Sequence, residues 1–222
     1  MSMKVIKVGE DILGANEDKA SANKSRLDSH GVLTVNIMSS PGAGKTSLIM
    51  GTIKYMKDKV SMAVIEGDIA SSVDAEKINE MGIPVVQINT AGGCHLDANM
   101  VERALNNLPL ENTDLLLIEN VGNLICPNEF ALGEDKRVMI SSLPEGDDKP
   151  YKYPPMFADS DVVLLNKIDL KPYLEFDVDN FKKTVAGLNP DVIFLPVSCK
   201  TGEGMDAWYD WLESVVKGKK KK

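Results

Sequence analysis

The chain has 222 residues, of which 43% are hydrophobic and 26% charged, and its formal net charge is −8. This length suits a single α/β domain over residues 1–222, the acidic balance argues against nucleic-acid binding, and no apolar run approaches the roughly 20 residues that span a bilayer. The first ten residues lack the apolar core of a secretory signal, so we expect a cytoplasmic protein.

The segment from Val5 to Arg26 has the partly amphipathic pattern of a helix, with Ile6, Ile12 and Leu13 on one side. This N-terminal helix either packs on the domain or docks a partner, and its pattern does not distinguish the two. At the other end, the lysines of Lys217 to Lys222 predict a disordered basic tail.

Between these ends, short apolar runs rich in β-branched residues alternate with helical patterns. We expect strands at Val32–Met38, Met62–Ile65, Val85–Ile88, Leu115–Ile118, Val138–Leu143, Val162–Leu165 and Val192–Val197. The alternation predicts a mostly parallel, doubly wound sheet of about seven strands with helices on both faces, and ligands then bind at the carboxyl ends of the strands.

A phosphate-binding loop follows the first expected strand. Its residues run from Ser39 to Thr46, and Ser39 stands where the usual pattern has a first glycine. Backbone N–H groups of such a loop point at phosphate oxygens, the lysine reaches the outer phosphates, and the threonine hydroxyl binds Mg²⁺. The nucleotide-binding candidates here are Pro41, Gly42, Ala43, Gly44, Lys45, Thr46 and Ser47.

Acidic residues at the ends of neighbouring strands are candidates for the Mg²⁺ shell. Asp68 closes the second expected strand and Glu119 the fourth, so we predict that both bind Mg²⁺ with Thr46, partly through water. Together with Lys45 these residues form the predicted catalytic set, and Gly122 would let the following loop move. Because no glutamine is evident to orient the attacking water, we expect slow intrinsic hydrolysis.

A cysteine–histidine pair and a second cysteine follow the third and fourth expected strands. Cys94, His95 and Cys126 offer the thiolate and imidazole ligands that suit Zn²⁺ or Ni²⁺. Three ligands leave a four-coordinate site open, so either water completes it or two copies of the chain share it. Since Glu119 and Cys126 lie on one loop, we expect nucleotide state and metal affinity to be coupled.

A polar, proline-rich stretch from Pro144 to Pro155 predicts a long surface loop without an element of its own. Further on, the sixth expected strand ends in Asn166, Lys167 and Asp169, an N-K-x-D pattern. Its carboxylate can accept two hydrogen bonds from guanine, whereas adenine would leave it unpaired. The last strand is followed by Ser198, Cys199 and Lys200, which complete the predicted GTP or GDP site.

These motifs closely resemble those of the HypB family of hydrogenase maturation GTPases. The motifs that carry the resemblance are the phosphate loop, Glu66-Gly67-Asp68, Cys94-His95-Leu96-Asp97, the run from Glu119 to Pro127, and Asn166 to Asp169. The resemblance implies a GTPase that helps deliver nickel to the large-subunit precursor of nickel–iron hydrogenase. It also implies a nucleotide-dependent homodimer, the metallochaperone HypA as a partner, and Cys94, His95 and Cys126 as metal ligands.

Three alternatives stay open at this point. The urease accessory GTPases share the architecture but carry a Cys-Pro-His element, whereas this chain has Cys94 directly before His95. A GTP-gated scaffold would need no metal transfer, and its cysteines would be structural. The chaperone GTPases of cobalamin-dependent mutases share the fold but give no reason for the cysteine and histidine elements.

Overall fold

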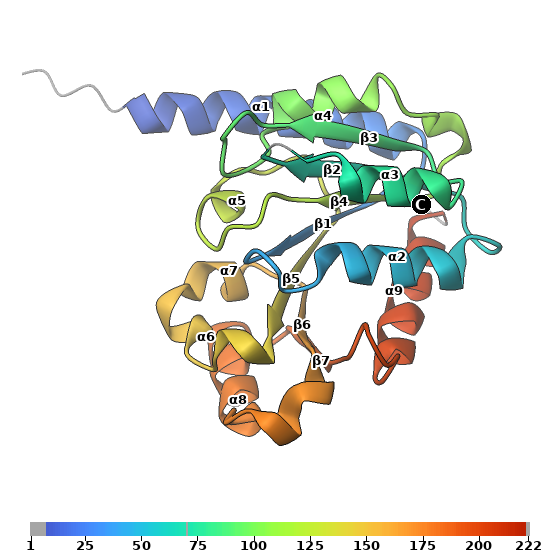
Figure 1. The fold of residues 1–222 in the computed structure, drawn as a ribbon. Coiled ribbons are helices and arrows are strands. Elements are labelled where there is room, and N and C mark those ends of the chain that lie inside the picture. Colours follow the sequence, from blue (N-terminus) through green and yellow to red (C-terminus); the bar gives the residue numbers. More distant parts are fainter. Residues whose placement is uncertain (1–7, 70, 221–222) are drawn as a thin grey trace, which may run out of the picture.

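A seven-stranded parallel sheet forms the centre of the part of the chain that the computed structural model describes, residues 8–69 and 71–220, with side chains from residue 12 on (Figure 1). The strand order is β3-β2-β4-β1-β5-β6-β7. The strands are β1 Leu33–Ser39, β2 Met62–Asp68, β3 Val85–Asn89, β4 Leu115–Glu119, β5 Lys136–Ser142, β6 Val162–Asn166 and β7 Ile193–Pro196. This sheet confirms the predicted fold class.

Helices cover both faces of the sheet, as Figure 1 shows. The α-helices are α1 Val8–Ser29, α2 Lys45–Met56, α3 Val73–Glu80, α4 Ala98–Leu105, α5 Cys126–Glu129, α6 Lys149–Lys152, α7 Pro154–Ala158, α8 Val178–Leu188 and α9 Met205–Lys219. The short 3₁₀ segments are η1 Leu110–Asn112, η2 Leu143–Glu145 and η3 Ile168–Tyr173. No helix within these described residues has the length and apolar character needed to cross a membrane.

The strand β4 explains why the central strands are apolar throughout. Leu115 and Leu117 pack with α2 and α9 in one core cluster, while Leu116 and Ile118 pack with α1 and α4 on the other face. Successive side chains of a strand point to opposite faces, so a strand covered on both sides needs an apolar residue at every position. The core therefore consists of two layers divided by the sheet, and the acidic residues Asp68 and Glu119 are the last residues of β2 and β4.

The N-terminal helix is packed against the domain from Asn16 onward. The sequence predicts a helix over Val5 to Arg26; α1 spans Val8–Ser29, and residues 5–7 lie outside the described residues. Asn16 and Asn23 are buried and donate hydrogen bonds to the carbonyls of Ala131 and Leu132, whereas Ile12 on the predicted apolar side is 53% exposed. The helix is therefore held partly by buried amides, which an apolar-periodicity argument does not detect.

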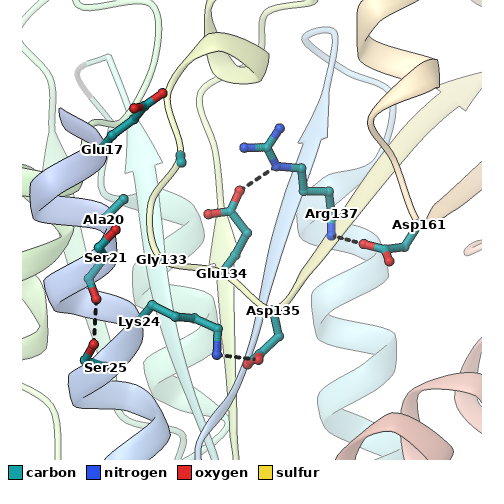
Figure 2. Close-up of a pocket in the computed structure, with 11 residues that line it drawn as sticks. Glu17, Ala20, Ser21, Lys24, Ser25, Gly133, Glu134, Asp135, Arg137 and Asp161 are labelled. Carbon is teal, nitrogen blue, oxygen red and sulfur yellow. Dashed lines mark hydrogen bonds and ion pairs between the residues drawn. The ribbon is translucent and has the colours of Figure 1, made fainter. Parts of the chain in front are cut away.

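Gly133 allows the backbone before β5 to reach α1. Its φ is +98°, and a Cβ at this position would lie 2.8 Å from the carbonyl oxygen of Ala20 and from the backbone nitrogen of Lys24. Figure 2 shows the groove beside this contact, where Lys24 faces Asp135 and Glu134 faces Arg137. Because the Lys24–Asp135 ion pair joins α1 to the segment before β5, it contributes to the docking of α1.

Two sequence-based expectations are wrong in the structure. The segment from Pro144 to Pro155 is not a loop without elements, because η2, α6 and the start of α7 lie within it and Pro150 is buried. The tail from Lys217 is helical through Lys219, while residues 221–222 lie outside the described residues. Lys219 forms ion pairs with Asp28 and Asp135, so part of the tail's charge is neutralised by acidic residues distant in sequence.

Candidate functional site

The phosphate-binding loop joins the end of β1 to the start of α2. Gly42 and Gly44 have φ values of +76° and +112°, and a Cβ on Gly44 would lie 2.3 Å from Nδ2 of Asn166. Glycine is therefore required at position 44 for both conformation and space. Ser39 ends β1 and is not among the residues with positive φ, which explains why a serine is tolerated there.

Lys45 lies buried beside the loop. Its Nζ donates to the hydroxyl of Ser39 over 3.2 Å. Burial lowers the pKa of Lys45, while the nearby carboxylates of Glu119, Glu66, Asp68 and Glu145 act to raise it. A buried ammonium group next to a loop of backbone donors makes a site that is electrostatically suited to an anion.

The threonine after Lys45 lies between two carboxylates. The hydroxyl of Thr46 is 2.9 Å from Oε1 of Glu119 and 3.0 Å from Oδ2 of Asp74. Asp68 lies on the same cavity wall, and its Oδ1 accepts a hydrogen bond from the N–H of Ser71. The structure thus brings Thr46, Asp68 and Glu119 to one cavity of about 450 Å³, as the sequence predicts.

Sequence reasoning missed two acidic residues of this cavity, Glu66 and Asp74. Asp74 lies in the first turn of α3, where an acidic residue is an ordinary helix-start preference and so gave no distinct signal. Glu66 pairs in register with Glu119 on the adjacent strand, and this could have been found only from the strand alignment.

Glu66 and Glu119 are both buried, and Oε2 of each has no hydrogen-bond partner within the described residues. Burial, helped by neighbouring carboxylates, raises the pKa of Glu66 to about 8 and that of Glu119 to about 7, although the Lys45 ammonium acts to lower both. Buried carboxylate oxygens without partners, next to a threonine hydroxyl, are the hard oxygen ligands that Mg²⁺ prefers. The residues present therefore fit a divalent cation beside the phosphate loop.

Residues of the N-K-x-D pattern contact the phosphate loop and the loop that follows β7. Asn166 donates to the carbonyl of Ala43 over 2.8 Å, and its Oδ1 accepts from the N–H of Cys199 over 3.1 Å. Lys167 has a positive φ of 62°, and its Nζ donates to the carbonyl of Gly42. Asn166 therefore joins the two loops that the sequence assigns to phosphate and base.

The carboxylate of Asp169, which is predicted to recognise guanine, is held in place by a hydrogen bond from Ser198. Ser198 is buried, and its hydroxyl donates to Oδ1 of Asp169 over 2.7 Å and accepts from the N–H of Thr201. Lys200 lies exposed in the turn that follows Cys199, and Ser47 is exposed at the start of α2. The structure thus places Asp169 and Ser198 together, while Lys200 lies at the rim.

Within the described residues, Cys94, His95 and Cys126 form a group that could hold a metal ion, with ligand atoms within 4.8 Å of one another; we call this group the metal-ligating cluster. The two Sγ atoms are 3.1 Å apart, and Sγ of Cys94 is 3.6 Å from Nδ1 of His95. A disulfide bond would bring the sulfurs to about 2.0 Å, so both cysteines are free thiols. The three residues are half-buried and can converge on one ion.

Neighbouring residues fix the conformation of the segment that carries Cys94 and His95. Gly92 has a φ of +98° and turns the chain after β3, and Asp97 then caps α4 by accepting a hydrogen bond from the N–H of Met100. His95 stacks on Phe130 with ring centroids 3.9 Å apart. Burial lowers the pKa of His95, which favours the neutral imidazole that binds metal.

The segment after β4 runs along the phosphate loop before it reaches Cys126. The N–H of Asn123 donates to the carbonyl of Ser39 over 2.8 Å. A Cβ on Gly122 would lie 2.9 Å from the backbone of Pro41. This position therefore requires glycine, because two backbone segments of the protein approach each other closely here. One stretch of backbone therefore contacts both the phosphate loop and the metal-ligating cluster.

Comparisons with known proteins found a matching family model, curated relatives and solved structures. Residues 33–196 match the family model described as the CobW/HypB/UreG nucleotide-binding domain. The hydrogenase maturation factor HypB of Rhizobium leguminosarum is 49% identical over 95% of this chain and 70% of its own length. Among solved structures, HypB from Archaeoglobus fulgidus has a TM-score of 0.86 and 38% identity, with 91% of this chain and 99% of that chain covered.

A second similar solved structure holds a metal. HypB from Helicobacter pylori, solved in complex with nickel, has a TM-score of 0.87 and 35% identity. The match covers 92% of this chain and 96% of that chain.

Proposed function

Since this chain belongs to the HypB family of nucleotide-binding hydrogenase maturation factors, we propose that it hydrolyses GTP and delivers nickel during maturation of a nickel–iron hydrogenase. The observation that carries the proposal is the cluster of Cys94, His95 and Cys126, whose ligand atoms lie within 4.8 Å of one another. Its loops follow β3 and β4, and β4 is the neighbour of β1, which the phosphate loop follows. The nickel complex of a related HypB structure supports the choice of metal.

In the proposed reaction the chain mainly positions GTP and stabilises charge. Backbone N–H groups from Gly42 to Ser47 bind the phosphates, with Pro41 beside them, and Lys45 places its ammonium on the outer phosphate oxygens. Asp169 accepts from the guanine edge, and Lys167 leaves the carbonyl of Gly42 and covers the base with its aliphatic stem.

Thr46, Asp68 and Glu119 would hold Mg²⁺, with Glu66 and Asp74 close by. When bound, Mg²⁺ supplies positive charge that neutralises the phosphate oxygens. Glu119 accepts a hydrogen bond from Thr46, so the loop that begins there responds to the occupancy of this site. Slow intrinsic hydrolysis follows from the lack of a glutamine aimed at the attacking water among the residues that line the described cavity.

Nickel is the cargo in this proposal, with Zn²⁺ as a competing ion that accepts the same ligands. The three ligands of one copy leave a coordination position, which water or a second copy of the chain fills in a nucleotide-dependent homodimer. The metallochaperone HypA and the precursor of the hydrogenase large subunit are the proposed partners. The free thiols fit action in the cytoplasm, where cysteines stay reduced.

The test is a nickel titration of the purified protein with GDP and, separately, with a non-hydrolysable GTP analogue. Thiolate-to-metal absorption reports binding, and light scattering reports dimerisation. We expect stoichiometric binding that Cys94→Ala and Cys126→Ala abolish and that Cys199→Ser, a matched thiol outside the cluster, retains. Nucleotide-dependent dimerisation with no metal bound at Cys94 and Cys126 would instead identify a GTP-gated scaffold.

A further inference from the structure

Leu96 lies where the two candidate sites meet. It directly follows Cys94 and His95 and is fully buried. Its side chain rests on β2, since a Cβ on Gly67 would lie 2.8 Å from Cγ of Leu96, and Gly67 precedes Asp68 of the nucleotide cavity. The residue after the metal-ligating pair is thus packed against the strand end that faces the nucleotide.

Asn120 anchors the backbone of Leu96. It directly follows Glu119 and is fully buried. Its Oδ1 accepts from the N–H of Leu96 over 3.1 Å and from the N–H of Val121 over 2.9 Å. The loop after β3 and the loop after β4 are therefore joined through one side-chain oxygen.

The orientation of Asn120 is fixed from the other side of its amide. Its Nδ2 donates to Oδ1 of Asn36 over 3.2 Å, and its own N–H donates to the carbonyl of Ile37 in β1. Asn36 is also fully buried, and its Nδ2 reaches Glu134. These bonds fix the direction of the amide oxygen, so the N–H of Leu96 is held by a side chain whose backbone directly follows Glu119.

We propose that Asn120 and Leu96 are positioning residues that couple the occupancy of the nucleotide site to the placement of Cys94 and His95. This inference rests on the proposed function. Glu119 accepts a hydrogen bond from Thr46, Asn120 is the next residue in the chain, and its Oδ1 accepts a hydrogen bond from the N–H of Leu96. Neither Asn120 nor Leu96 supplies a ligand atom to the metal-ligating cluster.

The amide oxygen is the part of Asn120 that the link requires. Asn120→Ala removes it and leaves the N–H of Leu96 without its acceptor in a buried site, whereas Asn120→Asp keeps an oxygen there. We therefore expect the aspartate variant to retain coupling and the alanine variant to lose it. A role in stability alone would not produce this rescue.

The experiment measures the nickel dissociation constant with GDP and with the non-hydrolysable GTP analogue, and takes their ratio as the coupling. A ratio of about 5 to 150 is typical of coupled sites. For Asn120→Ala we expect the ratio to fall to about 1 while stoichiometric nickel binding persists. Asn189→Ala is the matched control, because its Oδ1 also accepts from a backbone N–H and its Nδ2 donates to a carbonyl, far from both loops.

Linkage provides an internal check, since nickel must change the affinity for the GTP analogue by the same factor. Leu96→Val trims the side chain on Gly67 but keeps its backbone bond, and it serves as the second variant if Asn120→Ala does not fold. If the two nickel dissociation constants of the unmodified protein have a ratio near 1, the proposed function is contradicted. If the unmodified protein shows coupling and a folded Asn120→Ala or Leu96→Val variant keeps the same ratio, only the link through Asn120 and Leu96 is overturned.

Discussion

Replacing Asn166 with alanine tests whether one buried amide organises the whole nucleotide site. Its side chain is 2% exposed and makes three hydrogen bonds to backbone groups of the phosphate loop and the base loops. At about 1 kcal/mol for each bond, the variant loses about 3 kcal/mol of folding free energy. For a chain of this size that corresponds to about 6–12 °C in melting temperature.

The loss should also appear in nucleotide binding, because the bonds of Asn166 join the carbonyl of Ala43 to the N–H of Cys199. We expect weaker GDP binding in the folded variant, measured by fluorescence titration beside a urea denaturation curve. Asn180→Ala is the control, since Asn180 is exposed and its side-chain contact to Tyr151 is long, at 3.5 Å. An Asn166→Ala variant with unchanged melting temperature and unchanged GDP affinity would refute the reasoning.

Three further predictions concern stability, pH and the cation. Gly133→Ala should destabilise the fold by about 2–4 kcal/mol in urea denaturation, because its Cβ would meet backbone at 2.8 Å, whereas Gly187→Ala in open helical space should be neutral or slightly stabilising. Burial acts to raise the pKa of Asp135, but hydrogen bonds from lysines outweigh it and lower that pKa. Its stabilising contribution is therefore present above about pH 4 and lost as the pH falls below that, and Lys219→Met should shrink the difference between denaturation at pH 7 and at pH 3.5. Asp74→Asn should raise the Mg²⁺ concentration needed for tight GTP binding by about tenfold, and an unchanged Mg²⁺ dependence would exclude Asp74 from the cation site.

The strands and the site loops could be predicted because their signals are local. An apolar run such as Leu115–Ile118 identifies a strand covered on both faces, and the phosphate loop carries its requirement for Gly44 in the sequence itself. The grouping of Cys94 with Cys126 also followed from position, because both come after strands of one parallel sheet. For the strands and the phosphate loop the physical cause lies within a few residues of the pattern, whereas the cysteine grouping needs only the order of parallel strands.

The features that sequence reasoning missed depend on contacts between distant segments. Glu66 becomes part of the cavity only through its register with Glu119, and register is set by strand pairing. The helices at 149–152 and 154–158 were not predicted, because the prolines in this stretch indicated a loop. Proline is nevertheless well placed in the first turn of a helix, where both helices have it. Lys219, at the end of α9, pairs with Asp28 and Asp135, which are far away in the sequence.

The ion pairs of Lys219 have a consequence for the order of assembly during synthesis. Asp28 lies in α1 and Lys219 in α9, so this lysine is translated 191 residues after Asp28. Until α9 has been made, Lys24 is the lysine that pairs with both Asp28 and Asp135. The contact between α1 and α9 therefore closes only after all seven strands of the sheet have been translated.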